Sequence, residues 1–202
     1  MKAKYLVGID EAGRGPLAGP VAVAAVLQLS RRVLDSDKSL GRLQDSKKLS
    51  SKKREAWFEW LKRKQTNGDL KFTVALVSEK IIDRVGIVRA IKIGIKQCLD
   101  RLDLKSTQCR VLLDGGLRAP KNYQNQKTII RGDEQEPVIA LASIVAKVTR
   151  DRRLNKLAKI YPNYSFEIHK GYGTRAHYSA LRRHGFSPLH RRTFIIRRSG
   201  PV

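Results

Sequence analysis

Three short apolar runs in the sequence each lead into acidic residues that stand at or beside glycine. YLVGI precedes Asp10 and Glu11, VLL precedes Asp114, and TII leads into Arg-Gly-Asp133. Apolar runs of this length, bounded by glycine, are typical of buried β-strands. A carboxylate at the end of a buried strand loses hydration, so its charged form is disfavoured unless a cation compensates. The pattern therefore predicts one sheet whose strand ends bring the four carboxylates to a shared cation site.

The kind of cation follows from the ligand atoms that these side chains offer. Four carboxylates without a cysteine or histidine pair supply only hard oxygen ligands, which favour Mg²⁺ or Mn²⁺ over Zn²⁺. Two such ions about 4 Å apart suit phosphodiester hydrolysis, because one activates water and the other stabilises the leaving oxygen. Each aspartate is alternatively a simple turn or cap residue. Four other acidic residues compete as candidates: Asp45, Asp83, Asp151 and Glu167. Of these, Asp151 is expected instead to pair with neighbouring arginines.

The charge balance of the chain indicates the kind of partner. Its 202 residues include 42 Lys and Arg against 18 Asp and Glu, a net charge of +24. A polyanionic partner would relieve the self-repulsion of so much positive charge, and nucleic acid is the commonest such partner. Charge alone does not separate an enzyme from a non-catalytic nucleic-acid binder. The recurrence of carboxylates after apolar runs is what favours the enzyme.

The order of the predicted elements indicates an α/β fold, in which a mixed sheet carries helices against its faces. Two strands at 4–10 and 21–29, separated by the turn-rich GPLAGP, predict a hairpin. The polar segment 31–50 is expected to be a loop. The remaining predicted elements are a helix at 52–64, strands at 70–77, 110–116 and 127–133, and helices at 87–102, between Pro137 and Pro162, and at 176–184.

The length of the chain suits a single domain. No apolar stretch approaches the roughly 20 residues that a membrane-spanning helix needs. The N-terminal region lacks the apolar core of a signal peptide, so a cytoplasmic location is expected. Cys98 and Cys109 have no CxxC spacing. They are expected to be two reduced, buried thiols rather than a disulfide or part of a zinc site.

Several longer motifs together resemble those of ribonuclease HII, in family order and over nearly the whole chain. The resemblance implies an RNase H-like mixed β-sheet flanked by helices, with a small C-terminal helical extension. It also implies one catalytic domain over 1–202, in which the C-terminal region from about 164 to 202 completes the substrate-binding site. The motifs are GIDEAGRGPLAGPV at 8–21, DSKKLS at 45–50, LLDG at 112–115, RGD at 131–133, ASIVAKVTRDR at 142–152, YPNY at 161–164 and HKGYGTRAHYSALRRHGFSPLHRRTF at 169–194.

The resemblance assigns roles to individual residues. The metal-binding carboxylates of the family map onto Asp10, Glu11, Asp114 and Asp133. Its Gly-Arg-Gly element maps onto Gly13, Arg14 and Gly15, which implies recognition of a ribonucleotide 2′-OH and adjacent phosphates through backbone groups. An ordinary glycine-rich turn is the alternative for this element.

A tyrosine of the family maps onto Tyr172, which implies packing against the sugar of the deoxynucleotide that follows the ribonucleotide. The alternative is a tyrosine that only closes a loop. Ser46 and Lys47 are implied phosphate contacts. Weaker candidates for such contacts, for which a solvated charged face is an equal alternative, are Lys48, Arg191 and Arg192. The four histidines lack metal-ligand spacing and are expected to serve packing or phosphate contact: His169, His177, His184 and His190.

The function implied is that of an endoribonuclease acting on the RNA strand of RNA–DNA hybrids. It would also incise 5′ of single ribonucleotides embedded in duplex DNA, by two-metal-ion catalysis with Mg²⁺ or Mn²⁺, leaving 3′-OH and 5′-phosphate ends. Its expected partners are these nucleic acids, in ribonucleotide repair and primer removal, and the protein is expected to be a monomer without membrane contact. Two rival hypotheses are a non-catalytic basic nucleic-acid binder and an RNase H-fold nuclease that acts on DNA alone.

Overall fold

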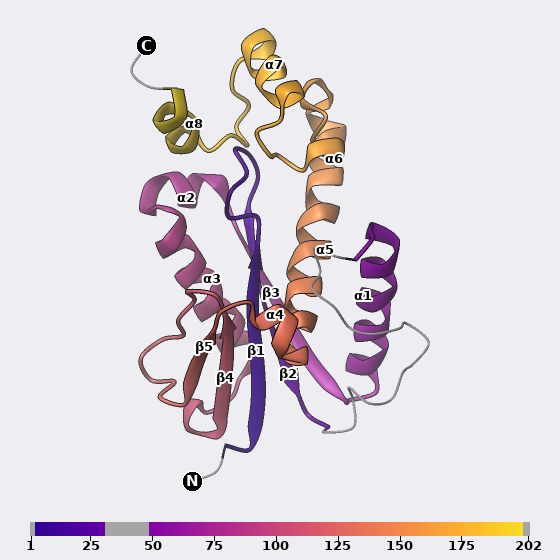
Figure 1. Cartoon of the computed structure of the whole chain (residues 1–202), viewed down its shortest axis with the longest axis vertical. Helices are drawn as coiled ribbons and strands as arrows, with labels where there is room; N and C mark the ends of the chain where they lie inside the picture. The colour runs from indigo at the N-terminus through magenta and orange to yellow at the C-terminus, as the bar shows by residue number, and fades with distance from the viewer. Residues whose placement is uncertain (1–2, 31–48, 200–202) are drawn as a thin grey trace.

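A five-stranded mixed sheet forms the centre of the computed structural model, which describes residues 3–30 and 49–199 (Figure 1). The strand order is β3-β2-β1-β4-β5. β1 pairs antiparallel with β2 and β2 with β3, whereas β4 runs parallel to both β1 and β5. The predicted hairpin and mixed sheet are thereby confirmed. The strands span Tyr5–Ala12 (β1), Val21–Gln28 (β2), Leu70–Val77 (β3), Cys109–Asp114 (β4) and Gln126–Ile129 (β5).

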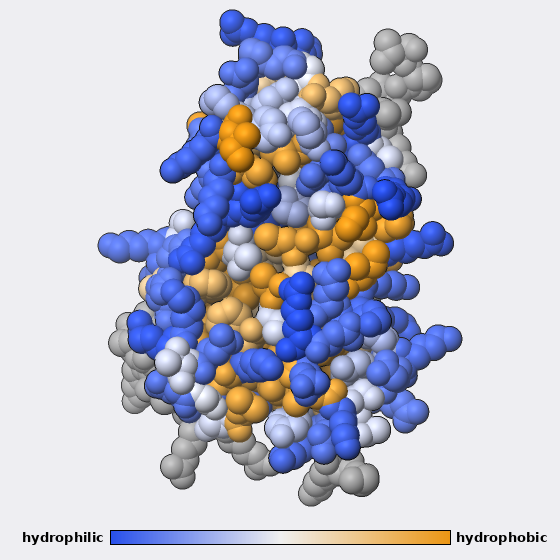
Figure 2. All heavy atoms as spheres, turned by 180° about the vertical axis from the view of Figure 1, so that it is seen from behind, coloured by the Kyte–Doolittle hydropathy of each residue, from blue (hydrophilic) through white to orange (hydrophobic). Residues whose placement is uncertain are grey.

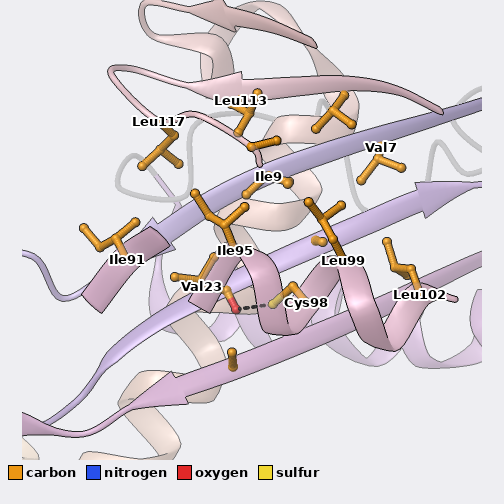
Figure 3. Close-up of a cluster of buried hydrophobic side chains, with 14 of the residues drawn as sticks. Val7, Ile9, Val23, Ile91, Ile95, Cys98, Leu99, Leu102, Leu113 and Leu117 are labelled. Atoms are coloured by element: carbon orange, nitrogen blue, oxygen red, sulfur yellow. Dashed lines mark hydrogen bonds between the residues drawn. The ribbon is translucent and has the colours of Figure 1, made fainter. Parts of the chain in front are cut away.

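Helices cover both faces of the sheet, because side chains along each strand alternate between the two faces. Val7 and Ile9 of β1 point into a core shared with α2 and α3, where Val23 of β2 also lies (Figure 3). The thiol of Cys98 donates a hydrogen bond of 3.2 Å to the Val23 carbonyl in this core. Both cysteines are buried free thiols, as predicted. The helices of this face span Glu79–Val85 (α2) and Ile87–Leu102 (α3).

The opposite face is covered by α1 and by the long helix α5, which span Ser51–Thr66 and Pro137–Ile160. Gly8 of β1 faces α5, and a Cβ atom there would overlap the backbone carbonyl of Val138. The glycine therefore lets the start of α5 lie directly against the central strand. This close approach places Ser143, five residues further along α5, beside Asp10, two residues further along β1.

The C-terminal region forms a helical extension at the far end of α5, as predicted (Figure 1). Its short helices span Phe166–His169 (α6), Arg175–His184 (α7) and Arg192–Ser199 (α8). A small apolar cluster joins this extension to α5 and to the loop between β1 and β2. Its members include Ala18, Leu154, Tyr164, Phe166 and Leu189.

The outer surface is strongly hydrophilic. Figure 2 shows blue, hydrophilic side chains around the margin of the rear face and at the end formed by the C-terminal extension, with a broad apolar band through the middle. On α7, Arg175, Arg182 and Arg183 are exposed. None of the helices in the described ranges combines the length and apolar character that a membrane crossing requires.

Several predicted boundaries were wrong. β5 ends at Ile129 rather than continuing to Asp133, because Arg131 adopts a left-handed conformation (φ 52°) and a short helix, α4 (Gly132–Gln135), follows. β4 ends at Asp114, since Gly115 turns with a φ of 54°. The helices α2, α4, α6 and α8 were not predicted. The expected loop at 31–50 lies outside the described residues up to position 48.

Candidate active site

Two of the predicted carboxylates lie near the ends of neighbouring strands: Asp10 stands two residues before the end of β1, which continues past its predicted end, and Asp114 is the last residue of β4. β1 and β4 are parallel and adjacent, and Ile9 is in register with Leu113. Asp10 and Asp114 therefore follow side by side at the same edge of the sheet, and the alternation of side chains directs both toward the face that carries α5. The structure brings these two aspartates together as the strand pattern predicts.

Asp10 is held in a nearly closed environment. Its side chain is only 4% exposed, and its Oδ1 accepts a hydrogen bond of 2.7 Å from the backbone N–H of Glu11. The hydroxyl of Ser143 on α5 donates a second hydrogen bond to it. Burial raises the pKa of Asp10 well above its usual range, and the charges of Glu11 and Asp114 raise it further. The carboxylate thus lacks sufficient positive charge around it.

Glu11 lies in the same environment as Asp10, but its side chain is more exposed to solvent. Its side chain is 12% exposed and lies 3.6 Å from Nη1 of Arg14. Burial raises the pKa of Glu11, the Arg14 guanidinium acts in the opposite direction, and the charge of Asp114 raises it again. The exposed Arg14 therefore offsets only part of the negative charge of Asp10, Glu11 and Asp114.

Asp133 reaches the same region from a turn rather than from a strand end. It lies on α4, is 5% exposed, and directly follows Gly132, whose N–H donates a hydrogen bond of 2.7 Å to Oδ1 of Asp114. Its strand position was wrongly predicted, but the segment that carries it is bonded to the end of β4.

The donor set fits a hard divalent cation. It consists of carboxylate oxygens, and the raised pKa values of Asp10 and Glu11 mark a place where added positive charge would stabilise the ionised forms. Within residues 3–30 and 49–199, no three acidic, histidine or cysteine side chains are already gathered into an assembled metal site. The carboxylates lie near one another without forming a closed coordination shell.

The Gly13-Arg14-Gly15 element begins the loop that follows β1. Gly13 is buried with a φ of 92°, and a Cβ atom there would overlap the side chain of Arg150 on α5. Arg14 and Gly15 are exposed, and a Cβ on Gly15 would meet no atom within 4 Å. A Gly-only conformation therefore presents an accessible backbone beside Glu11.

Arg191 is not the surface residue that the sequence predicts. Its side chain is completely buried and donates three hydrogen bonds to carbonyl groups of the β1–β2 loop, those of Gly13 (2.7 Å), Arg14 (3.1 Å) and Gly19 (2.9 Å). It cannot contact a phosphate in this position, so its role is to hold the loop. Arg192 is exposed, and its backbone N–H donates to Asp83 on α2.

Arg150 on α5 holds the same loop through a second set of hydrogen bonds. It is 1% exposed and donates to the carbonyls of Ala18 (3.1 Å), Pro20 (2.9 Å) and Lys170 (3.0 Å). Sequence reasoning missed its role and that of Ser143. A serine inside an apolar helical run was the available signal for Ser143, whereas the acceptors of Arg150 come from distant segments. The expected arginine partner of Asp151 is also wrong, because Asp151 pairs with Lys147 at 2.9 Å.

Tyr172 lies on a loop that touches the Gly-Arg-Gly loop. The N–H of Leu17 donates to the carbonyl of Gly171 at 2.8 Å, and the Tyr172 side chain is 46% exposed. A large aromatic ring is thus presented to solvent, next to the backbone that could contact a nucleic acid. Exposure of this kind is typical of an aromatic side chain that packs against a nucleotide.

The histidines divide into a buried group and one exposed residue. His169, His177 and His190 are buried and hydrogen bonded, which favours the packing role over the phosphate contact that was its alternative. His184 is exposed at the end of α7. The candidates Ser46, Lys47 and Lys48, as well as the competing Asp45, lie outside the described residues.

Comparison with known proteins decides the family. A family model described as ribonuclease HII matches residues 7–198 of the chain. The chain belongs to the ribonuclease HII family. Curated proteins of that name are 45% identical in Endomicrobium trichonymphae, over 94% of this chain and 84% of the relative, and 43% identical in Coxiella burnetii, over 94% and 87%. The family recognised from the motifs is confirmed.

Solved structures agree with the fold. Ribonuclease HII of Archaeoglobus fulgidus, described in its complex with PCNA, superimposes with a TM-score of 0.72 at 26% identity, over 92% of this chain and 93% of that one. Ribonuclease HIII called Bst-RNase HIII, described in complex with Mn²⁺, is 14% identical with a TM-score of 0.63, over 91% and 63%, and shows the fold alone. As a member of the ribonuclease HII family, the chain is a metal-dependent nuclease that hydrolyses RNA in RNA–DNA hybrids.

Proposed function

We propose that this ribonuclease HII chain also incises duplex DNA on the 5′ side of single embedded ribonucleotides, leaving 3′-OH and 5′-phosphate ends. The observation that carries the proposal is the hydrogen bond between Leu17 and Gly171, 2.8 Å long. It joins the loop of Gly13, Arg14 and Gly15 to the loop of Tyr172. A single sugar and its neighbour can therefore be contacted by both loops beside the carboxylates.

In this proposal each loop recognises a different nucleotide: one the ribonucleotide and the other the deoxynucleotide that follows it. The exposed backbone at Arg14 and Gly15 reads the 2′-OH and adjacent phosphates, because the glycines leave room for a nucleic-acid strand to approach. The exposed ring of Tyr172 packs against the next sugar, where a 2′-OH would clash. Together they select a ribonucleotide followed by a deoxynucleotide. Ser46 and Lys47 remain proposed phosphate contacts.

Four carboxylates form the proposed catalytic centre. Asp10 and Asp114 hold the metals most directly, and Glu11 and Asp133 complete the ligand set. Two Mg²⁺ or Mn²⁺ ions, when bound, supply water activation and stabilisation of the leaving oxygen. The Ser143 hydroxyl and the Glu11 amide keep the Asp10 carboxylate in a fixed orientation. Arg14, 3.6 Å from Glu11, connects this centre to the recognition loop.

The C-terminal region, from about 164 to 202, belongs to the same proposed catalytic domain and completes its substrate site. Support comes from the contacts of Arg191 and Gly171 with the β1–β2 loop. The exposed arginines of α7 extend this surface with positive charge suited to the backbone of a duplex. Repair of misincorporated ribonucleotides and removal of primers would use this activity.

One assay separates this proposal from its rivals. The protein is incubated with Mg²⁺ or Mn²⁺ and a labelled DNA duplex carrying one ribonucleotide, beside the same duplex without the 2′-OH. We expect a single cut 5′ to the ribonucleotide, an intact all-DNA duplex, and loss of cutting in D10A. A non-catalytic binder would cut neither duplex, and a DNA nuclease would cut both. Undiminished cutting by D10A would remove the carboxylate site from the proposal.

A further inference from the structure

A short segment between α7 and α8, residues 187–191, contacts the β1–β2 loop directly and is linked through His177 to the loop of Tyr172. The Gly19 N–H donates to the Leu189 carbonyl at 2.8 Å, and the Arg191 N–H donates to the Leu17 carbonyl at 2.7 Å. Ala18 and His190 form an antiparallel bridge between these bonds. The segment therefore lies along the β1–β2 loop like one additional strand.

From this segment, the side chain of Arg191 extends under the Gly-Arg-Gly element. Its guanidinium group donates to three carbonyls, and among the described residues it forms no ion pair with an acid. The guanidinium also lies over the ring of Phe194, 5.2 Å from its centroid. Burying a charge without an acidic partner is costly, which indicates that Arg191 has a positioning role. The planar fork of arginine can join three acceptors, whereas the single ammonium group of lysine cannot hold the same geometry.

The preceding residue, His190, is linked by hydrogen bonds to the loop of Tyr172 rather than to the Gly-Arg-Gly element. The backbone N–H of Ser187 donates to His190 Nδ1 at 2.9 Å, so the ring proton lies on Nε2. His190 Nε2 then donates to Nε2 of His177 at 3.0 Å, and Nδ1 of His177 donates to the carbonyl of Tyr172 at 2.9 Å. Each imidazole is neutral and has one allowed tautomer. The chain of bonds therefore fixes the backbone at Tyr172.

We propose that His190 and Arg191 are positioning residues that set the spacing between the Gly-Arg-Gly loop and Tyr172: Arg191 supports cutting at any ribonucleotide, and His190 supports the preference for a lone one. Arg191 holds the loop that reads the 2′-OH, and His190 holds, through His177, the ring that reads the following sugar. Two adjacent residues thus fix two recognition elements that are about 160 positions apart in the chain. The inference rests on the proposed function and adds the residues responsible for its selectivity.

The role of His190 is tested by comparing cleavage of the single-ribonucleotide duplex with cleavage of a continuous RNA–DNA hybrid. A continuous RNA–DNA hybrid places no deoxynucleotide after the cut, so it depends less on Tyr172. We expect H190L to lower kcat/KM on the single-ribonucleotide duplex about tenfold or more while hybrid cleavage changes less than about threefold. H190Q, whose amide can still donate toward His177, should recover part of the loss. H184Q, at the exposed histidine, is the matched control and should behave as the unaltered protein.

The Arg191 half is tested with R191K, which keeps the charge and most of the packing. We expect about a tenfold lower kcat/KM on both ribonucleotide substrates, with an unchanged Mg²⁺-induced shift in melting temperature and unchanged binding to the all-DNA duplex. R63K, at an exposed arginine of α1, is the matched control. A purely structural role would lower the Mg²⁺-induced shift and every activity together, which would overturn the inference.

The outcomes distinguish this inference from the proposed function beneath it. Failure of the unaltered protein to cut the single-ribonucleotide duplex would refute the proposed function. Cutting by the unaltered protein, with the same substrate ratio retained in H190L and H190Q, would refute the positioning role alone. Circular dichroism and thermal unfolding of each variant accompany the assays. If H190L loses its fold, the milder H190Q carries the decision for His190. For Arg191 the variant tested is already the conservative R191K.

Discussion

Gly132 donates its backbone N–H to Oδ1 of Asp114, across a distance of 2.7 Å. This bond connects the end of β4 to the first turn of α4, the turn that carries Asp133. One proposed metal-binding aspartate thus orients the segment that supplies another. The charge of Asp114 also raises the pKa of Asp10, so the two carboxylates lie close enough to interact.

Replacing Asp10 with asparagine should stabilise the metal-free protein. Burial raises the pKa of Asp10, so its ionised form is disfavoured in the fold at neutral pH, and the neutral amide removes that cost. We expect D10N to raise the melting temperature at pH 7.5 by about 3 °C or more, the shift that roughly 1 kcal/mol produces in a domain of this size.

The same variant should gain little further stability when Mg²⁺ or Mn²⁺ is added, whereas the unaltered protein should gain. Differential scanning fluorimetry with and without each ion measures both effects. A D10N protein that melts below the unaltered one without metal would contradict the account of its pKa.

Gly171 should tolerate no side chain. It has a φ of 81°, and a Cβ atom would lie 2.5 Å from the carbonyl oxygen of Ala18, which is backbone and cannot move aside. We expect G171A to cost about 2–4 kcal/mol of unfolding free energy, from the left-handed conformation and from this overlap. Cleavage at single ribonucleotides should fall with it, because the Tyr172 loop is displaced.

A matched control is G68A. Gly68 has a similar φ of 76°, but a Cβ there would meet no atom within 4 Å. Urea unfolding should show a cost of only about 1 kcal/mol for this variant, with full activity. Equal costs for the two substitutions would mean that the contact with Ala18 is unimportant.

Acid should weaken the fold through the buried histidines. Burial, reinforced by the charge of His177, lowers the pKa of His190 to about 4. The unfolded chain binds a proton near pH 6.5 and the folded chain does not, so stability is complete above about pH 6.5 and declines as the pH falls toward 4. Between pH 7.5 and pH 5 this one residue should cost about 2 kcal/mol.

Urea unfolding of the unaltered protein and H190Q at both pH values isolates the contribution. The difference in unfolding free energy between the two pH values should be smaller in H190Q by about that amount. An identical pH dependence in both proteins would show that His190 is not the group responsible. H184Q serves as the exposed control.

The two thiols should be inert in the native protein. Burial raises the pKa of Cys98 to about 11 and also raises that of Cys109, so neither forms the reactive thiolate at pH 8. Mass spectrometry after iodoacetamide treatment should show no added group on the folded protein and two on the urea-unfolded protein. Rapid labelling of Cys98 in the folded state would contradict the packing of the α3 core.

Most of the sheet could be predicted because β1, β2 and β4 contain apolar runs bounded by glycine, proline or polar residues. β5 was drawn too long because its apolar residues continue past Ile129, while the left-handed conformation of Arg131 ends the strand. Short polar helices such as α2 show too few turns for a periodic signal. Their existence depends on tertiary contacts that a local pattern does not contain.

The acidic residues of the candidate site were found because carboxylates after apolar runs are unusual. The residues that hold the site together were not found in the same way. Arg191 stands in a run of basic residues, which is normally solvated, and only the fold shows that its donors reach Gly13. Arg150 donates to acceptors as far as 132 positions away. No local spacing encodes such partners.

The bond between Arg191 and Gly13 joins residues 178 positions apart. The ribosome therefore synthesises the proposed recognition loop well before its buried support. Before Arg191 is synthesised, the nascent chain can form its central strands, which carry the carboxylates, while the proposed recognition loop still lacks its bond to Arg191. Under the proposed function, the selection of a sugar therefore requires synthesis to reach Arg191, and a chain released earlier would have its carboxylates without this support for the proposed recognition loop.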